Sequence, residues 1–420
     1  MVQAVFILSI IVIIYGGYFA VTGLFSFAKS KTYIGNYRPK TRFAVIIPAR
    51  NEGDVIGDLL HSLNNMDYPA RLYDIYTLIN NCTDDTRQKA ISLGAEVIDC
   101  EGDITCKGDV LRFAFDRLKD RNIDAYVIFD ADNVVHPGFL AAMNNVYQSG
   151  HEVAQGRKDS KNMGDNWISA SYSLFYNLQN YFYNKARTHA GAAATINGTG
   201  FMVAKELVDT GFEPRSVTED IELALMCLLK GHKVVYTDEA VTYDEQPTDF
   251  KTAWYQRKRW SRGILQCLVY YSAPLFKRFI TKREYSSLDK ILFMVSPCMQ
   301  LFALIPTLLT IILVVSGVER DLVLNSMMLS TILGAVGGYI LTVSMCIFTI
   351  RQYGQNIKES LSGIFMFMLF MLSWVPINMC CAVRSKQGWV PVKHCRNVNI
   401  DALFDRVSFK DSSVSGNYVQ

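Results

Sequence analysis

Long uncharged apolar stretches lie near both ends of the chain. Residues 1–28 contain no charged side chain, and the run from Val5 to Phe25 is long enough to cross a bilayer, which takes about 20 apolar residues. Toward the other end, three further stretches are long enough to span: Ile291–Val318, Leu322–Ile350 and Ser360–Val383. Because a backbone in lipid must satisfy its own hydrogen bonds, each stretch is predicted to be a helix.

Basic residues set the expected orientation of the first helix. Lys29, Lys31 and further cations up to Arg42 follow it directly, and the positive-inside rule places that flank in the cytoplasm. A cleaved signal peptide is the alternative, but the apolar core is too long and no basic segment precedes it. We therefore expect a multi-pass protein of the plasma membrane whose central region is cytoplasmic.

The number of C-terminal spans conflicts with the charges of the tail that follows them. Three spans would carry the tail outside, whereas the cations between Arg384 and Arg396 predict a cytoplasmic tail. Either one apolar stretch lies along the interface or is split, as Pro297 and Pro306 suggest for the first, or the charge rule fails here. We favour the interfacial or split stretch.

The central region alternates short apolar runs with helical patterns. The expected strands are Phe43–Ile47, Tyr73–Ile79, Glu96–Asp99 and Ala125–Phe129, and the expected helices are Asp54–Asn65, Asp84–Leu93 and Asp109–Lys119. This β-α-β order predicts an α/β domain with a mostly parallel sheet and helices on both faces. Ligands of such sheets bind at the carboxyl ends of the strands.

Composition and charge narrow the class of partner. Half of the 420 residues are hydrophobic, mean hydropathy is positive, and the net charge is only +3. This balance and the lack of a basic, aromatic-interleaved groove indicate no nucleic-acid partner. Ten scattered cysteines form no CxxC pair and no zinc spacing, which is typical of reduced thiols in a cytosol-facing protein.

Two carboxylates follow the last expected strand. Asp130 and Asp132 form a DxD pattern at the carboxyl end of an apolar run. A hard divalent ion such as Mg²⁺ or Mn²⁺ needs only one or two carboxylates when a diphosphate supplies its other oxygen ligands. An isolated DxD is more often a solvated turn, so this pattern alone decides nothing.

A second acidic group opens a helical pattern. In Thr218-Glu219-Asp220, the carboxylate of Asp220 is a candidate general base for an acceptor hydroxyl. The competing interpretation is structural, because Ser216-x-x-Glu219 fits a capping box and acids favour a first helical turn.

The third pattern combines an amide, a cation and an indole. Gln256, Arg259 and Trp260 share one helical face, where Trp260 offers a stacking platform for a sugar and Arg259 a fork for phosphate. The alternative is an interfacial helix whose cations meet lipid headgroups, and we keep that interpretation for Arg257 and Lys258. The mixed segment Ile264–Phe279 is also predicted to lie along the interface.

Weaker signals accompany these three patterns, and each one alone is more often an ordinary turn or cap. They are Glu52, Asn80 and Asp84 in turns after strands, Lys107 before a helix, and Gly198 and Gly200 where a glycan could approach the backbone.

Taken in order, the motifs resemble a known family. They are Pro48-Ala-Arg-Asn-Glu52, Thr83-Asp84, Asp130-x-Asp132, Thr218-Glu219-Asp220 and Gln256-x-x-Arg-Trp260. The set resembles the membrane-embedded glycosyltransferases of family 2, which include cellulose, hyaluronan, chitin and poly-N-acetylglucosamine synthases. The match covers residues 42 to about 265, with apolar stretches on both sides.

The resemblance implies a glycosyltransferase-A fold and a role for each motif. Asp132 would hold a divalent metal and the diphosphate, with Asp130, Glu52, Asn80, Asp84 and Lys107 around the UDP-sugar. Asp220 would be the base of a single inverting displacement. Glu219, Gln256, Arg259, Trp260, Gly198 and Gly200 would contact the acceptor and the donor sugar. Asn80 departs from the family, since many members carry an acid there.

Two functions remain open at this point. The first is transfer from a UDP-sugar, with UDP-glucose before UDP-N-acetylglucosamine, to a growing β-linked polysaccharide. The second is single addition to a lipid such as ceramide or diacylglycerol.

The tail Trp389-Val-Pro-Val-Lys-His394 also resembles a gating tail of some relatives. A silent nucleotide-sugar scaffold is disfavoured because Asp130, Asp132, Asp220 and Trp260 are all retained.

We therefore expect six segments. They are an N-terminal transmembrane helix (1–28), a basic linker (29–41), the catalytic domain (42–255), the Gln-x-x-Arg-Trp and interfacial helices (256–285), a transmembrane bundle (286–383) and a tail (384–420).

Overall fold

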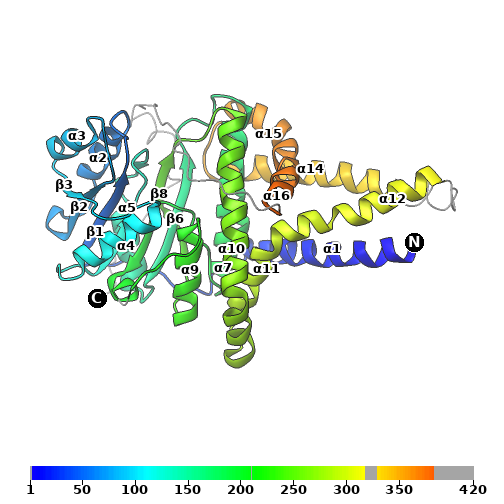
Figure 1. The fold of residues 1–420 in the computed structure, drawn as a ribbon, viewed down its shortest axis with the longest axis horizontal. Helices are drawn as coiled ribbons and strands as arrows, with labels where there is room; N and C mark the ends of the chain where they lie inside the picture. The colour runs from blue at the N-terminus through cyan, green and yellow to red at the C-terminus, as the bar shows by residue number, and fades with distance from the viewer. Residues whose placement is uncertain (1, 210, 317–328, 383–420) are drawn as a thin grey trace.

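A mixed eight-stranded sheet forms the centre of the computed structural model, which describes residues 2–209, 211–316 and 329–382 (Figure 1). The strands are β1 (Phe43–Ala49), β2 (Tyr73–Ile79), β3 (Glu96–Asp99), β4 (Ala125–Ile128), β5 (Val134–Val135), β6 (Val153–Ser160), β7 (Phe201–Ala204) and β8 (Val235–Asp244). Their order across the sheet is β3-β2-β1-β4-β7-β6-β8-β5.

The sequence predicted a mostly parallel sheet, and only half of the observed sheet is parallel throughout. Strands β3, β2, β1 and β4 are parallel, as predicted, but β7 pairs antiparallel with both β4 and β6. Strand β8 returns parallel to β6, and β5 is antiparallel to β8. The α/β class is confirmed, and the second half of the sheet is what distinguishes this fold from a fully parallel one.

Helices cover both faces of the sheet, as the alternation predicted. One core cluster joins the sheet to α2 (Ile56–Asn64) and α5 (Phe139–Gln148), and the other joins it to α4 (Lys107–Leu118) and α9 (Glu219–Lys230). The short helices α3 (Thr86–Ser92), α7 (Ala186–His189) and α8 (Lys205–Val208) fill the connections. Helix α6 (Trp167–Leu178) continues through a π-helical stretch, Gln179–Lys185, into α7.

The apolar ends form long helices that leave the sheet domain. Helices α1 (Val2–Gly23), α12 (Leu304–Ser316) and α14 (Leu329–Gln352) extend in one direction, and α10 (Phe250–Lys282) runs across their base (Figure 1). Helix α11 (Tyr285–Phe302) leads from α10 into α12. Within the residues that the structure describes, four segments are long and apolar enough to cross a membrane: Val2–Phe27, Tyr285–Leu313, Leu333–Gln352 and Ile357–Cys381.

The last apolar stretch is split and packs on the sheet domain. It forms α15 (Ile357–Leu372) and α16 (Trp374–Ala382), which meet at Ser373. Helix α15 lies against α6, and α16 lies against α10 and α11. The first stretch also breaks between α11 and α12, at Ala303.

A buried ionic joint fixes the long helices to the sheet domain. Asp289 on α11 accepts hydrogen bonds from the Tyr18 hydroxyl of α1 (2.8 Å) and from the Arg187 guanidinium of α7 (3.0 Å). Lys290 donates to the Tyr183 hydroxyl at 3.2 Å. Because Asp289, Lys290 and Arg187 are all buried, these contacts hold α1 and α11 in a defined position.

Candidate active site

The candidate catalytic residues gather where β1, β2 and β4 end. Asn51 and Asn81 both adopt positive φ angles, 57° and 52°, in the loops that follow β1 and β2. The two loops are tied together, because the Thr83 amide donates to Asn51 Oδ1 at 2.7 Å and the Glu52 amide donates to Thr86 Oγ1 at 2.9 Å. Glu52 therefore lies beside the turn that follows β2.

Asp84 and Asn80 shape this pair of loops. The carboxylate of Asp84 accepts from the Gly53 amide at 2.9 Å and from the Thr86 hydroxyl. Burial alone would raise the pKa of Asp84, but these hydrogen bonds lower it below its ordinary value. Asn80 is buried, and its backbone N–H donates to the Ala49 carbonyl at 3.0 Å.

The Lys107 side chain, itself a predicted site residue, contacts two other predicted motifs, the DxD pattern and the glycine turn. Its ammonium forms an ion pair with Asp130 and donates to the Gly198 carbonyl at 2.7 Å. Burial would lower the pKa of Lys107, but Asp130 and the nearby acids raise it, so the side chain stays cationic. Lys107 thus links the N-terminus of α4 to the end of β4 and to the glycine turn.

The glycine turn brings Asp220 to the same place. Gly198 and Gly200 have φ angles of 83° and 63°, and a Cβ added at Gly198 would lie 3.6 Å from Asp220 Oδ2. A Cβ at Gly108 would collide with Pro214 and Glu219. The N-terminus of α4 and the loop before α9 therefore pack closely around Asp220.

The capping box considered at Ser216 is not formed. Helix α9 begins at Glu219 with Thr218 as N-cap and no side-chain cap, while Glu222 accepts from the Arg215 and Ser216 amides at 2.9 and 2.7 Å. Glu219 is buried and Asp220 is half-buried. Burial raises the pKa of both carboxyls, whereas the charges of Lys107 and Arg259 lower them.

A buried polar network that sequence reasoning missed lies behind the DxD loop. Asp132 is only 4% exposed, and the Asn133 amide lies 3.4 Å from its Oδ1 and donates to Asp244 Oδ1 at 3.1 Å. The Lys158 ammonium pairs with Asp244 Oδ2 at 2.6 Å. The one signal in the sequence is the charged run Arg157-Lys158-Asp159 in the second half of β6.

The residue types at the DxD fit a divalent cation. Asp130 and Asp132 present carboxylate oxygens at the end of β4, where Mg²⁺ or Mn²⁺ finds hard ligands. Within residues 2–209, 211–316 and 329–382, no three His, Cys, Asp or Glu side chains form a ready metal site. A diphosphate would have to complete the coordination.

The nine cysteines within those ranges are free.

Helix α10 places the Gln-x-x-Arg-Trp motif beside Asp220. A Cβ at Gly263 would lie 2.3 Å from Thr218 Oγ1, so this part of α10 packs directly on the start of α9. The Gln256 Oε1 atom is buried and has no hydrogen-bond partner in the described part of the chain. An orphaned acceptor of this kind is expected where a ligand binds.

The interpretation of Arg257 as a headgroup ligand is wrong. Arg257 is fully buried, and it donates to the Phe370 carbonyl at 3.1 Å and to Ser373 Oγ at 2.6 Å. It therefore anchors α15 and α16 to α10. The predicted gating tail, Trp389–His394, lies outside the described residues.

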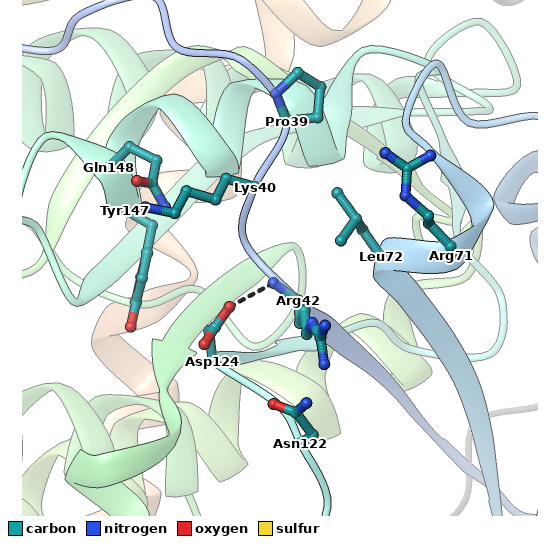
Figure 2. A pocket seen from close by; sticks show the side chains of 9 residues that line it. All are labelled: Pro39, Lys40, Arg42, Arg71, Leu72, Asn122, Asp124, Tyr147 and Gln148. Atoms are coloured by element: carbon teal, nitrogen blue, oxygen red, sulfur yellow. Dashed lines mark hydrogen bonds between the residues drawn. The ribbon is translucent and has the colours of Figure 1, made fainter. Parts of the chain in front are cut away.

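A cavity lies away from these residues. It measures about 610 Å³ and is lined by Lys40, Arg42, Arg71, Asp124 and neighbours (Figure 2). Arg42 and Asp124 directly precede β1 and β4, so the cavity opens at the amino ends of the parallel strands. The predicted site occupies the opposite, carboxyl edge, where ligands of such sheets bind.

Comparison with known proteins points to one family. The family model described as glycosyltransferase-like family 2 matches residues 39–263, more than half of the 420 residues. Strands β1 to β8, α9 and the Gln-x-x-Arg-Trp motif of α10 all fall within that range.

Several characterised or curated proteins resemble the chain at low identity. The probable glycosyltransferase YdaM of Bacillus subtilis is 25% identical over 58% of this chain and 60% of its own length. A beta-monoglucosyldiacylglycerol synthase of Nostoc is 26% identical over 67% of this chain and 61% of its own. The probable glucomannan 4-beta-mannosyltransferase 14 of Arabidopsis thaliana is 27% identical over 59% and 49%. The chain thus spans about half to three-fifths of these relatives.

A solved structure shares the fold. The mannosyltransferase PcManGT from Pyrobaculum calidifontis, in complex with GDP-Man and Mn²⁺, superposes with a TM-score of 0.59 at 16% identity. The match covers 88% of this chain and 99% of that one, so it includes long helices as well as the sheet domain. It confirms the glycosyltransferase-A type of fold predicted from the motifs.

Proposed function

The chain belongs to glycosyltransferase-like family 2, and we propose that it transfers a hexosyl group from a nucleotide sugar, with inversion, to an acceptor hydroxyl at a membrane surface. The observation that carries the proposal is the convergence of Lys107, Asp130 and Asp220 on the Gly198 turn. The groups that we propose as base, cation and nucleotide-binding carboxylate therefore lie around one point.

Asp220 has the surroundings that a general base requires. Burial raises the pKa of Asp220 above its ordinary value, which strengthens it as a base, while Lys107 and Arg259 favour its ionised form. A base that takes the acceptor proton supports a single displacement, so an α-linked donor would give a β-linked product.

The donor is proposed to lie across the ends of β1, β2 and β4. Glu52, Asn80 and Asp84 would border the base, Lys107 and Asp130 the phosphates, and Gln256 and Arg259 would close over the sugar. Mg²⁺ or Mn²⁺ held by Asp132 and the diphosphate would supply the charge neutralisation that a departing nucleotide needs. The fit of the carboxylates to such an ion and the Mn²⁺ in PcManGT support this cofactor.

UDP-glucose is the donor we propose first, followed by UDP-N-acetylglucosamine. Glucosyl transfer is named for the Nostoc relative, whereas mannosyl transfer is named for the Arabidopsis relative and for PcManGT. GDP-mannose therefore belongs in any donor panel. The growing β-linked glycan predicted from the sequence is one candidate acceptor, and a lipid is the second.

We further propose that the protein lies in the plasma membrane with its sheet domain on the cytoplasmic side. Crossings by α1, by α11 with α12, and by α14 would leave both ends of the sheet domain on one face. With α15 and α16 packed on that domain, the basic tail would lie on the same face as Lys29 and Lys31, as the charge rule requires.

The test is release of nucleotide diphosphate by the purified full-length protein in phospholipid vesicles. We expect turnover of one donor among UDP-glucose, UDP-N-acetylglucosamine and GDP-mannose, dependent on Mg²⁺ or Mn²⁺ and abolished by chelator. The product should carry a β linkage, read by sensitivity to a β-glycosidase. An α-linked product would overturn the inverting mechanism, and chelator-resistant turnover would overturn the metal requirement.

A further inference from the structure

The backbone that leads into helix α9 is held by side chains. Three consecutive backbone amides, those of Arg215, Ser216 and Val217, each donate to a side-chain oxygen. The first two donate to Glu222 Oε2, at 2.9 and 2.7 Å. The third donates to Gln266 Oε1 at 3.0 Å. These two side chains therefore fix the path of the chain just before the proposed base.

Glu222 ties this segment both to its own helix and to α10. It lies in the first turn of α9, six and seven residues after the amides that it accepts, and it is fully buried. Its other oxygen, Oε1, accepts from the Tyr271 hydroxyl at 2.7 Å. Burial and the hydrogen bond to Glu222 raise the pKa of Tyr271, so the hydroxyl stays protonated and donates. Loss of Glu222 would therefore leave buried donors without an acceptor, which is costly.

Helix α10 supplies the other two side chains of this arrangement. Gln266 and Tyr271 follow the point where α10 packs on the start of α9, at which a Cβ on Gly263 would lie 2.3 Å from Thr218 Oγ1. The Gln-x-x-Arg-Trp motif lies a few residues earlier on the same helix. The contacts of Gln266 and Tyr271 therefore fix the segment before α9 relative to that motif.

The position of Asp220 depends on the held segment. Asp220 is the second residue of α9, and the N-cap, Thr218, joins that helix to the three amides. Because the first amides of a helix have no partner within it, the turn that carries Asp220 relies on contacts outside the helix. A general base must lie within hydrogen-bond distance of the proton that it takes, and a misplacement of about 1 Å can cost about 100-fold in rate.

Resting on the proposed function, we infer that Glu222, Gln266 and Tyr271 form a positioning clamp that holds the Asp220 carboxylate within reach of the acceptor hydroxyl. Glu222 is the centre of the clamp, since it accepts two backbone amides and the Tyr271 hydroxyl. The clamp acts on kcat rather than on donor binding, because the nucleotide is proposed to lie at the ends of β1, β2 and β4.

The experiment measures kcat, the KM for the donor and the thermal unfolding midpoint of full-length variants in phospholipid vesicles. The donor is the nucleotide sugar that the wild-type protein turns over. Tyr271→Phe removes one hydroxyl and should lower kcat about tenfold, with the KM for the donor unchanged. Glu222→Ala removes all three hydrogen bonds and should lower kcat about 100-fold. Glu222→Gln should recover most of that loss, because its amide oxygen can accept both backbone N–H groups while its NH2 group donates to Tyr271.

Tyr68→Phe is the matched control. Tyr68 is a buried tyrosine whose hydroxyl donates to the Thr41 carbonyl at 2.8 Å. Thr41 lies just before β1, at the edge of the sheet opposite the candidate site. Tyr68→Phe should lower the unfolding midpoint as Tyr271→Phe does, because each loses a hydrogen bond of a buried or half-buried tyrosine, but it should leave kcat unchanged.

The variant that combines Glu222→Ala with Tyr271→Phe distinguishes a clamp from two independent contacts. If Tyr271 acts through Glu222, the kcat of the combined variant should equal that of Glu222→Ala alone. Additive losses, or a wild-type kcat in Tyr271→Phe, would overturn the clamp while leaving the glycosyltransferase function intact. The comparison of Tyr271→Phe with Tyr68→Phe decides even where Glu222→Ala does not fold. No turnover of any nucleotide sugar by the wild-type protein would instead overturn the proposed function, on which the clamp rests.

Discussion

The Lys158 ammonium lies 2.6 Å from the Asp244 carboxylate, and both side chains are buried behind the DxD loop. Asp244 in turn accepts a hydrogen bond from Asn133, whose side-chain oxygen accepts from the Asp130 amide at 3.2 Å. The backbone of the loop that presents Asp130 and Asp132 is therefore held from below by an ion pair on β6 and β8. A loop positioned in this way can present its carboxylates without first reorganising.

We predict that Lys158→Met weakens metal-dependent nucleotide binding by about 10- to 100-fold, as loss of an outer-shell partner usually does. Without Lys158, Asp244 loses its ion pair and Asn133 loses its fixed partner. The measurement is titration calorimetry with the nucleotide diphosphate at saturating Mn²⁺. Lys185→Met is the control, because its pair with Asp238 is partly exposed. Equal binding in both variants would show that the network is only structural.

Asp220→Asn should lower kcat by about 10²- to 10⁴-fold, the usual contribution of a general base. The amide is nearly the same size but cannot accept a proton, so the affinity for the nucleotide should stay within a few-fold of wild type. Turnover and nucleotide binding are measured on the same preparation. Turnover near the wild-type rate would remove Asp220 from the mechanism.

Asp132→Ala should abolish the metal-dependent part of nucleotide binding. The carboxylate is a ligand type that Mg²⁺ and Mn²⁺ prefer, and alanine offers no oxygen in its place. We expect the affinity of the variant in Mn²⁺ to equal that of the wild type in chelator. A variant that still responds to added Mn²⁺ would exclude Asp132 as the metal ligand.

Arg259→Gln should move the acid limb of the pH–activity profile to higher pH. Burial raises the pKa of Asp220, and the Arg259 charge opposes that shift. Removing the charge raises the pKa further, and a base works only when deprotonated, so activity is lost at a higher pH as the solution is acidified. The profile of kcat against pH measures the limb. Arg278→Gln is the control, since Arg278 binds the Leu229 carbonyl, away from Asp220.

Asp289→Ala should destabilise the protein by about 3–5 kcal/mol, because it leaves Arg187 and Lys290 buried without their anion. Thermal unfolding in a single detergent reports the change. Asp99→Ala removes an exposed ion pair with Arg87 and should cost no more than about 1 kcal/mol. Similar losses of unfolding free energy in the two variants would show that the buried ion pairs of Asp289 contribute no more to stability than an exposed pair does.

Local sequence patterns predicted the first half of the sheet well. Strands β1, β2, β3 and β4 lie within one or two residues of the expected runs, and Gly94, with a positive φ of 85°, follows α3 just after the end of the expected helix Asp84–Leu93. Regular alternation of apolar runs and turn residues is a local property, so it can be read without knowing what each strand contacts. Strands β7 and β5 are too short to give such a pattern, and their antiparallel pairing was not foreseen.

The candidate site was predicted as a set of separate motifs, and the structure brings several of them together. Lys107, Asp130, Gly198 and Asp220 meet at one point, although none of them is adjacent to another in the chain. Lys158 and Asp244 were missed because their side chains are buried by segments remote in sequence, each by the other's strand and Lys158 also by Tyr176 of α6. The pattern of apolar and polar residues around a charge does not show that it is buried when its partner is remote in sequence.

What the sequence determined by itself is the chemistry: which carboxylates, cations and rings are present, that they follow strands of an α/β domain, and that apolar helices flank them. What only the tertiary structure decided is where the last apolar stretch goes. Composition alone makes Ile357–Cys381 a candidate span, because hydropathy counts apolar residues without recording what they pack against. The contact of Gly363 with Ala170 and the burial of Arg257 under Phe370 arise between segments far apart in the chain. Those contacts place α15 and α16 along the sheet domain and bring Trp374 to Trp260.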